Sequence, residues 1–521
     1  MSRSLRKPTG PEVAVFVSGV ASMGLEILAG RMIAPEFGNS IYTWGSIIGV
    51  FLTALSLGYY LGGRRAARRA SRRRLVGLLV GTAGYVAIVI FAGDILLRSA
   101  EIIPLPARFG SVPAVTLLFG PPTYLLGFIS PYAAELSRKD TAGEASGHVY
   151  ALGTIGSIVG AFGTTFALIP AFGVDTIAFL FGGVTLTTAG WLLAPEFPRR
   201  ATLQAVIVAV LLVGAVVSPT VGVSAEGQII HQAQTPHQEL EVIDRGTVRT
   251  LYLDGQRHSA MDRSEPERHV FEYTRYFHLP YLFANTTTSI DRVLFVGGGG
   301  FTGPKQFDRR YNVTVDVVEI DRTVIDVAKR YFGVKESPTL RIHNAGGRQY
   351  LSETDRTYDL IVLDAYRKDT VPFQLTTVEF MELLDERLTA DGMVVANLIS
   401  APSGPASQFY RAEYKTMDQV FPQVYTFPTT SAPVVQNVEL VATKHDSRVN
   451  QSTLRARNDR RAIGLDLETA VSHYRPPPRT DDVPVLRDDR APVDRLLDPM
   501  VGQQYVIDET ANVSRTETER E

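Results

Sequence analysis

The first 222 residues contain a series of apolar segments, and this feature limits the possible folds more than any other. A helix needs about 20 apolar residues to cross the hydrocarbon core of a bilayer. Segments of about this length occupy residues 12–34, 44–63, 75–96, 112–134, 148–169, 172–195 and 201–222. We therefore expect a transmembrane domain of about seven helices over residues 1–222. The chain is then a multi-pass integral protein of the cell membrane, with the lipid bilayer as a partner.

The charge balance differs between the two halves of the chain. Residues 1–222 carry 17 Lys and Arg against 10 Asp and Glu, whereas residues 223–521 carry 35 against 44. A basic surplus beside apolar runs is typical of membrane orientation, and an acidic second half argues against a nucleic-acid partner. The chain has no cysteine, which excludes disulfides, thiolate chemistry and cysteine metal sites.

An arginine cluster between residues 64 and 74 follows the second apolar segment. It fits a cytoplasmic anchor, and a patch for lipid headgroups or nucleic acid is the alternative. The basic residues Arg3, Arg6 and Lys7 agree with a cytoplasmic N-terminus. Seven crossings from that side would place the second half outside, so the sequence leaves the side of the soluble domain open.

The second half has the pattern of two further domains and an extension. Residues 238–253 indicate two short strands, and Asp254-Gly255 a turn, within a small β-hairpin domain over 223–290. Residues 291–445 alternate strands and helices, which predicts an α/β Rossmann-like, doubly wound and mostly parallel sheet. The expected strands cover 293–296, 313–320, 340–343, 360–363 and 393–398. Residues 446–521 form a polar C-terminal extension.

A glycine loop follows the first of these strands in VLFVGGGGFTG, residues 293–303. Gly297, Gly298 and Gly299 would let a ligand approach the backbone, and the absence of a following Lys-Ser/Thr pair excludes a P-loop. Glu319 comes 20 residues after Gly299 at the end of the second strand, where a carboxylate can bind ribose hydroxyls. This spacing predicts a nucleoside-containing ligand. The alternative is a tight turn beside a solvated acid.

A second acid, Asp364, ends the fourth strand in DLIVLDAY and should point into the same crevice. It can take a proton from an amine nucleophile or hold a cationic substrate, and a helix cap is the alternative. Asp369 follows in a loop closed by Pro372. Two carboxylates at one mouth favour a polycationic amine.

These motifs together resemble the polyamine aminopropyltransferases, or spermidine synthases, and most closely their membrane-fused relatives. The similar segments are HQELEVIDRGTVRTLYLDG, FHLPYLF, VLFVGGGG, VVEID, DLIVLDAY, VPFQLTTVEF and a late DDRAPVDRLL. The resemblance implies a small β-domain before a methyltransferase-like Rossmann domain. It also implies transfer of an aminopropyl group from the co-substrate decarboxylated S-adenosylmethionine to a polyamine such as putrescine, without a metal. Homodimers are common in that family.

The resemblance assigns roles to individual residues. Gln238 matches a contact to the donor, Glu319 the ribose-binding acid and Asp364 the proton acceptor. Pro372 matches the proline of the substrate loop, and Asp369 its second acid after two inserted residues. His258 and Tyr273 stand at substrate-facing positions where the family has other residues.

Two acids of the family are missing. Gly300 replaces the acid of the glycine loop, and Gly346 replaces the acid near the adenine, for which Asn344 is the nearest substitute. The leading hypothesis is a membrane-anchored aminopropyltransferase. An S-adenosylmethionine-dependent methyltransferase is the second, because loss of the acid at Gly300 removes a repulsion against the donor's carboxylate. A membrane transport or binding protein with a degenerate synthase domain is the third, favoured by the missing acids and the odd span count.

Overall fold

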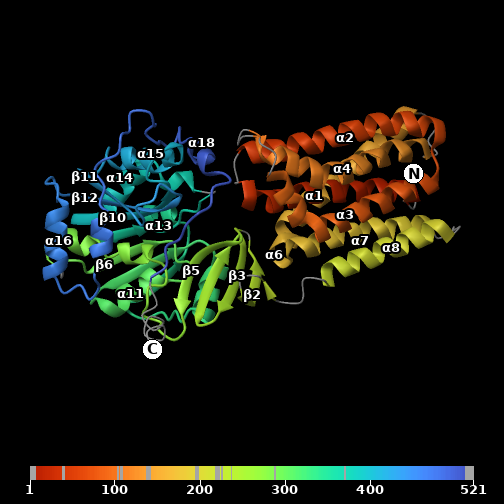
Figure 1. Cartoon of the computed structure of the whole chain (residues 1–521). Helices are drawn as coiled ribbons and strands as arrows, with labels where there is room; N and C mark the ends of the chain where they lie inside the picture. The colour runs from red at the N-terminus through yellow and green to blue at the C-terminus, as the bar shows by residue number, and fades with distance from the viewer. Residues whose placement is uncertain are drawn as a thin grey trace. The chain divides into compact units, whose positions relative to one another are not determined.

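The computed structural model describes residues 8–37, 41–101, 105, 109–136, 142–193, 199–217, 223–224, 227–235, 237–286, 289–368 and 371–510. The chain divides into two compact units, Met1–Gly222 and Val223–Glu521 (Figure 1). Each unit has its own hydrophobic core, and the two are described separately below.

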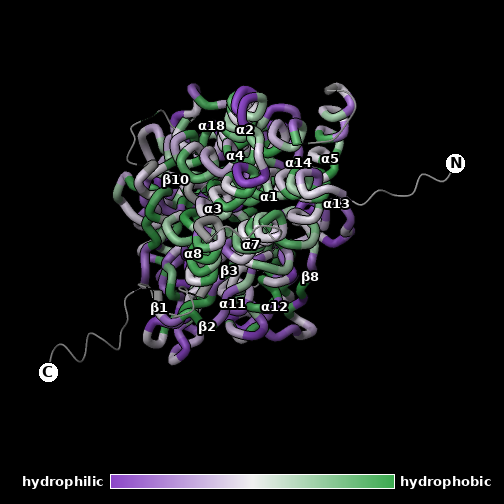
Figure 2. Tube along the Cα trace, turned by 90° about the vertical axis from the view of Figure 1, so that its right-hand side faces the viewer, coloured by the Kyte–Doolittle hydropathy of each residue, from purple (hydrophilic) through white to green (hydrophobic). Residues whose placement is uncertain are grey.

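All the regular secondary structure described in the first unit is helical. Its main helices are α1 (Gly10–Phe37), α2 (Ile41–Arg69), α3 (Arg72–Glu101), α4 (Ser111–Leu136), α5 (Ala142–Gly163), α7 (Val174–Leu193) and α8 (Arg199–Val217). A π-helical turn, η2 (Thr164–Leu168), and the short α6 (Ile169–Ala171) extend α5. The arginine-rich end of α2 stands out as a hydrophilic stretch beside apolar helices (Figure 2).

Six helices in the described residues are long and apolar enough to cross a membrane. The seventh predicted segment does form a helix, α8, but its apolar stretch Thr202–Gly214 falls among the shorter ones. The structure describes the side chains of α8 only over residues 202–214, so six candidate spans lie in the described residues and the seventh predicted span stays a prediction.

Glycines allow two of these helices to pack closely. A Cβ at Gly156 would lie 2.2 Å from the carbonyl oxygen of Phe16, and one at Gly160 would lie 2.4 Å from that of Val20. The backbones of α1 and α5 therefore touch, as small residues permit in helix pairs.

The second unit begins with a five-stranded antiparallel sheet whose strands pair in chain order. They are β1 (Val223–Ser224), β2 (Gly227–Gln234), β3 (Glu239–Arg245), β4 (Val248–Leu253) and β5 (Gln256–Asp262). Asp254 and Gly255 have φ angles of 48° and 73°, so the turn between β4 and β5 lies where the sequence predicts it.

The larger sheet of the second unit has seven strands in the order β11-β12-β10-β9-β6-β7-β8. They are β6 (Arg292–Val296), β7 (Thr314–Glu319), β8 (Leu340–Asn344), β9 (Tyr358–Leu363), β10 (Leu388–Ser400), β11 (Gln423–Pro428) and β12 (Gln436–Thr443). β6 to β10 run parallel, and β12 is antiparallel to both neighbours. This confirms the predicted Rossmann-like doubly wound sheet, and adds two antiparallel strands that the sequence did not predict.

Helices cover both faces of this sheet, and the strand residues alternate between two cores. The helices include α11 (Thr302–Arg310), α12 (Arg322–Tyr331), α13 (Gly347–Glu353), α14 (Val378–Arg387) and α15 (Gln408–Met417). In β6, Leu294 and Val296 belong to one core, and Val293 and Phe295 to the other. The chain order of the strands reverses between β6 and β9, which is where ligands bind in such sheets.

Residues 446–510 follow the last strand of the sheet and belong to the second unit. They include α16 (Gln451–Arg460), α17 (Glu468–Ser472), α18 (Val493–Leu497) and the turn η6 (Asp498–Met500). We call residues 483–510 the C-terminal strap. Its apolar side chains Leu486, Val493, Leu496, Leu497 and Met500 are buried in the core that also holds β9 and β10.

Candidate active site

A cavity of about 470 Å³ lies at the carboxyl ends of β6, β7 and β9. Seven of the predicted site residues line it, and they come from the small sheet, the glycine loop and the ends of the parallel strands. They are Gln238, His258, Gly297, Gly299, Glu319, Asp364 and Pro372.

The glycine loop packs directly against the end of β9. Gly297 has a φ of 100°, and a Cβ there would lie 2.3 Å from the carbonyl oxygen of Asp364. Only glycine fits this approach without moving the backbone. Phe301, with a φ of 57°, is fully buried at the start of α11. The loop and the strand end that carries Asp364 are therefore held in contact.

Glu319 ends β7, and backbone groups of the loop hold its side chain. One carboxylate oxygen accepts the N–H of Gly298 at 2.9 Å, and the other accepts the N–H of Asp321 at 2.9 Å. Burial raises the pKa of Glu319, and these hydrogen bonds oppose the rise by stabilising the ionised form. The remaining lone pairs of a cavity-lining carboxylate are suited to two neighbouring hydroxyl groups.

Asp364 follows β9, which flanks β6 on the side away from β7, and it also lines the cavity. Its Oδ1 accepts a hydrogen bond of 2.8 Å from Nδ2 of Asn397 on β10. Burial raises the pKa of Asp364 to about 7, the bond from Asn397 opposes the rise, and the charge of Glu319 adds to it. A carboxylate with such a pKa is suited to accept a proton near neutral pH.

An arginine that the sequence analysis missed ties the loop after β9 to the small sheet. Nη1 of Arg367 donates to Oδ2 of Asp254 at 2.5 Å and to Oε1 of Gln238 at 3.3 Å. Burial, together with the charge of Arg367, lowers the pKa of His258 to about 4. His258 is therefore neutral at physiological pH. The only sequence signal for Arg367 is its place three residues after Asp364.

Three predicted residues do not line the cavity, and one cannot be placed. Tyr273 is buried, and its hydroxyl donates to the carbonyl of His258 at 3.0 Å. The amide of Asn344 donates to the carbonyls of Glu319 and Ile320, each at 2.9 Å, instead of facing a ligand. Gly298 contributes its N–H to Glu319. Asp369 lies outside the described residues.

The two missing acids have different structural settings. A Cβ at Gly300 would lie 2.7 Å from the Cβ of Ser259, so a side chain at this position collides with β5. At Gly346 the nearest atom to such a Cβ, in Gln349, is 3.9 Å away, and the φ angle is −71°. The structure therefore has room for an acid at Gly346 but not at Gly300.

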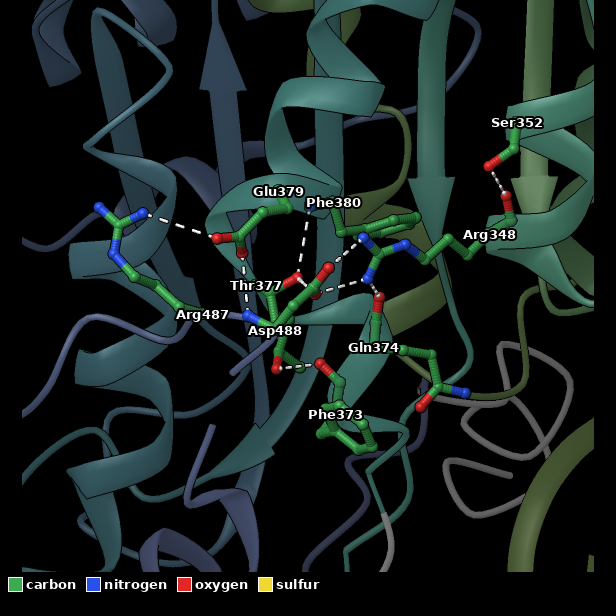
Figure 3. Close-up of polar contacts among 10 residues, drawn as sticks. Arg348, Ser352, Phe373, Gln374, Thr377, Glu379, Phe380, Arg487 and Asp488 are labelled. Atoms are coloured by element: carbon green, nitrogen blue, oxygen red, sulfur yellow. Dashed lines mark hydrogen bonds and ion pairs between the residues drawn. The ribbon is translucent and has the colours of Figure 1, made fainter. Parts of the chain in front are cut away.

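The wall near β8 contains further residues that the sequence did not indicate. Arg348, Gln349 and Gln374 line the cavity there. The guanidinium of Arg348 forms two hydrogen bonds, of 2.7 and 2.6 Å, with the carboxylate of Asp488 in the C-terminal strap (Figure 3). Because these residues are more than a hundred positions apart, no local pattern could have predicted the contact.

Comparison with known proteins gives a consistent result. Residues 272–451 match the family model of the spermine/spermidine synthase domain. A polyamine aminopropyltransferase of Vibrio vulnificus is 30% identical over 211 residues, which cover 39% of this chain and 68% of that protein. Polyamine aminopropyltransferase 2 of Ralstonia nicotianae is 24% identical over 426 residues, 76% of this chain and 79% of that protein.

The Ralstonia match covers more of this chain than residues 223–521 make up, so the similarity extends into the helical unit. Among solved structures, the spermidine synthase of Thermotoga maritima aligns with a TM-score of 0.38 and 19% identity. That alignment covers 48% of this chain and 84% of the other.

Proposed function

This chain belongs to the polyamine aminopropyltransferase family, and we propose that it transfers an aminopropyl group from decarboxylated S-adenosylmethionine to a polyamine such as putrescine. The observation that carries the proposal is Asp364, a half-buried carboxylate at the end of β9 that lines the cavity and has a pKa raised to about 7. It shares one cavity with Glu319 and the glycine loop, which suit a nucleoside.

In the proposed reaction, Asp364 takes a proton from a primary ammonium group of the acceptor. The freed nitrogen lone pair attacks the methylene carbon attached to the donor's sulfonium. The carbon–sulfur bond breaks, and its electron pair stays on sulfur as methylthioadenosine leaves. Glu319 binds the ribose hydroxyls, and the backbone of Gly297 to Gly299 lies against the nucleoside. Positioning of the two reactants and proton removal together account for the rate enhancement.

The direct test uses the full chain purified in detergent, incubated with decarboxylated S-adenosylmethionine and a panel of diamines. We expect release of methylthioadenosine with at least one amine, and a loss of about 10²- to 10⁴-fold in kcat for Asp364→Asn. Folded wild-type protein that releases no methylthioadenosine with any amine would sink the proposal.

A second candidate is methyl transfer from S-adenosylmethionine. It is favoured by the absence of an acid at Gly300 and by the guanidinium of Arg367 in the cavity wall, since both tolerate a donor with a carboxylate. Calorimetric titration with both donors separates the two functions. Tighter binding of the decarboxylated donor counts against methyl transfer.

Membrane anchoring is also part of the proposal. Six candidate spans in the described residues support it, and the N-terminal basic residues favour a cytoplasmic start. With an even number of crossings, the second unit returns to the cytoplasm. We propose that α8 does not cross the bilayer, because only then does a chain with a cytoplasmic start hold the second unit on the side of a cytosolic donor.

A further inference from the structure

We propose that the C-terminal strap, residues 483–510, is a positioning element for both ends of the active-site cavity. Asp488 fixes the wall that contains Arg348 and Gln374, and Tyr505 orients Asp364 through two asparagines. The assignment of a nucleoside end and a reacting end rests on the proposed function.

Asp488 is the centre of a polar cluster that joins three segments (Figure 3). Besides its two bonds to Arg348, its Oδ1 accepts the hydroxyl of Thr377 at 2.7 Å, and its N–H donates to Glu379 at 3.0 Å. Arg348 also donates to the carbonyl oxygen of Gln374 at 3.1 Å. The carboxylate of Asp488 thereby links the start of α13 to the start of α14, and Arg348 extends this link to the turn after Pro372.

This cluster stands behind the wall that would face the base of a nucleoside. Glu319, at the end of β7, marks the ribose, and Asp364, at the end of β9, marks the reacting end. The base must then extend toward β8, where Arg348, Gln349 and Gln374 line the cavity. A bidentate arginine–carboxylate pair restricts both side chains, so Asp488 fixes the shape of this wall.

The second contact of the strap reaches the proton acceptor through a chain of hydrogen bonds. Tyr505 donates to Oδ1 of Asn437 at 2.8 Å, and Nδ2 of Asn437 donates to Oδ1 of Asn397 at 2.8 Å. Nδ2 of Asn397 donates to Asp364 at 2.8 Å. With the tyrosine donating at one end, both amides are held in the orientation that presents an N–H to Asp364.

Several charged and titratable groups around Asp364 also act on its pKa, and the orientation of the Asn397 amide acts together with them. Glu319 on β7 and Glu439 on β12 interact with it electrostatically, as do Tyr273 on α9 (Tyr273–Tyr276) and Tyr505. Arg367 is on the same loop. Both oxygens of the fully buried Glu439 have no hydrogen-bond partner within the described residues. The bond from Asn397 is the only hydrogen bond described to the Asp364 carboxylate, and it favours the ionised form.

The first test measures the dissociation constant of 5′-methylthioadenosine by calorimetry on the full chain. We expect Asp488→Asn to weaken binding by about tenfold, because it removes one charge-assisted contact. Asp482→Asn is the matched control. Asp482 lies immediately before the strap and forms a similar ion pair with Arg411, in which Nη2 of Arg411 donates to Oδ2 of Asp482 at 2.9 Å. Neither residue lines the cavity. Equal affinities in the two variants would overturn the role of Asp488.

The second test measures the pH dependence of kcat/KM for Tyr505→Phe. Loss of the hydroxyl frees the two amides to turn, which weakens the hydrogen bond from Asn397 to Asp364. The pKa of Asp364 should therefore rise, and the increase of activity with pH should move to higher pH. Methylthioadenosine affinity should stay unchanged. Tyr414→Phe is the control, because the buried hydroxyl of Tyr414 donates only to the carbonyl of Val424, at 3.2 Å. An unchanged pH dependence in Tyr505→Phe would overturn the role of Tyr505.

The two kinds of failure are distinguishable. If wild type binds methylthioadenosine without turnover, and Asp488→Asn weakens that binding while Asp482→Asn does not, the proposed function fails and the role of Asp488 stands. If wild type turns over and all four variants match it, the proposed function stands and the strap has no positioning role.

Discussion

The carboxylate of Asp364 gives the site a defined dependence on pH. Because its pKa is raised to about 7, the ionised form that can accept a proton becomes dominant above neutrality. We expect kcat/KM of the wild type to rise through about pH 7, because this parameter reports the pKa of the free protein. The measurement is methylthioadenosine release at subsaturating substrates between pH 5.5 and 9. A rate that falls over this interval would contradict the assignment of Asp364 as the proton acceptor.

The same pKa predicts an effect on stability. The folded-state pKa lies above the unfolded value of about 3.9, so the native protein binds more protons between these values and loses stability as pH rises through them. Asp364→Asn removes the cost of the buried charge. We expect the variant to be more stable than wild type at pH 8, by about 2–4 kcal/mol, and similar to it near pH 4. Thermal unfolding at the two pH values, with a surface Asp→Asn control, checks this.

The two glycines that replace family acids should respond differently to restoration. Gly346→Asp has space for its side chain beside the base wall, so we expect a folded variant with changed affinity for methylthioadenosine, tighter by about tenfold if the acid reaches the ligand. Gly300→Asp pushes against Ser259, and we expect it to lower the melting temperature. Calorimetry and thermal unfolding of both variants test the contrast. A stable Gly300→Asp protein would show that β5 can move.

The predicted residues that the structure brings together in the cavity have a common physical basis. Glu319 and Asp364 each follow a buried strand, and the ends of parallel strands meet at one edge, so their positions were readable from the pattern. Asn344 also ends a strand, but its amide donates hydrogen bonds to backbone carbonyls at the end of the neighbouring strand β7. Arg348 and Asp488 become a site only through contacts between distant segments, which no local pattern contains.

At the scale of elements, the loop after β9 carries a cation into the cavity wall. Arg367 is paired with Asp254, and removal of the guanidinium would leave that carboxylate uncompensated. We therefore expect Arg367→Gln to lower KM for a diamine, because the cavity becomes more negative. The effect should shrink at high salt and be absent for the neutral nucleoside. Initial rates at several diamine concentrations and two ionic strengths measure it. A higher KM for the diamine would show that Arg367 holds the loop closed rather than repelling the substrate.

The sheet itself was only partly predictable. β6 to β10 are apolar runs that end at turns or acids, and the sequence placed all five. β12 was missed because every residue in it is buried, yet it includes Gln436, Asn437 and Glu439. Such polar residues hide a strand from a hydrophobicity pattern. Asn437 belongs to the hydrogen-bond chain that reaches Asp364. In β12, a polar residue connected to the site therefore replaces one of the apolar residues expected in a buried strand.

For the whole molecule, the number of crossings decides on which side the second unit works. A cytoplasmic start with six crossings would bring the C-terminus back to the cytoplasm, and seven would leave it outside. On the proposed function we expect a fluorescent or alkaline phosphatase reporter fused there to give the cytoplasmic signal. The control is the same pair of reporters fused after residue 195, before α8, which should give the same side. Opposite signals from the two positions would mean that α8 crosses the bilayer.

Membrane anchoring through the six candidate spans, as proposed, would also change the concentration of substrate near the protein. A bilayer with anionic lipids has a surface potential of about −30 mV, which enriches a divalent cation at the surface by roughly tenfold. A diamine carrying two positive charges is such a cation. An aminopropyltransferase held at this surface would therefore be half-saturated at a bulk diamine concentration below its intrinsic KM, and its rate would depend on the lipid composition of the membrane.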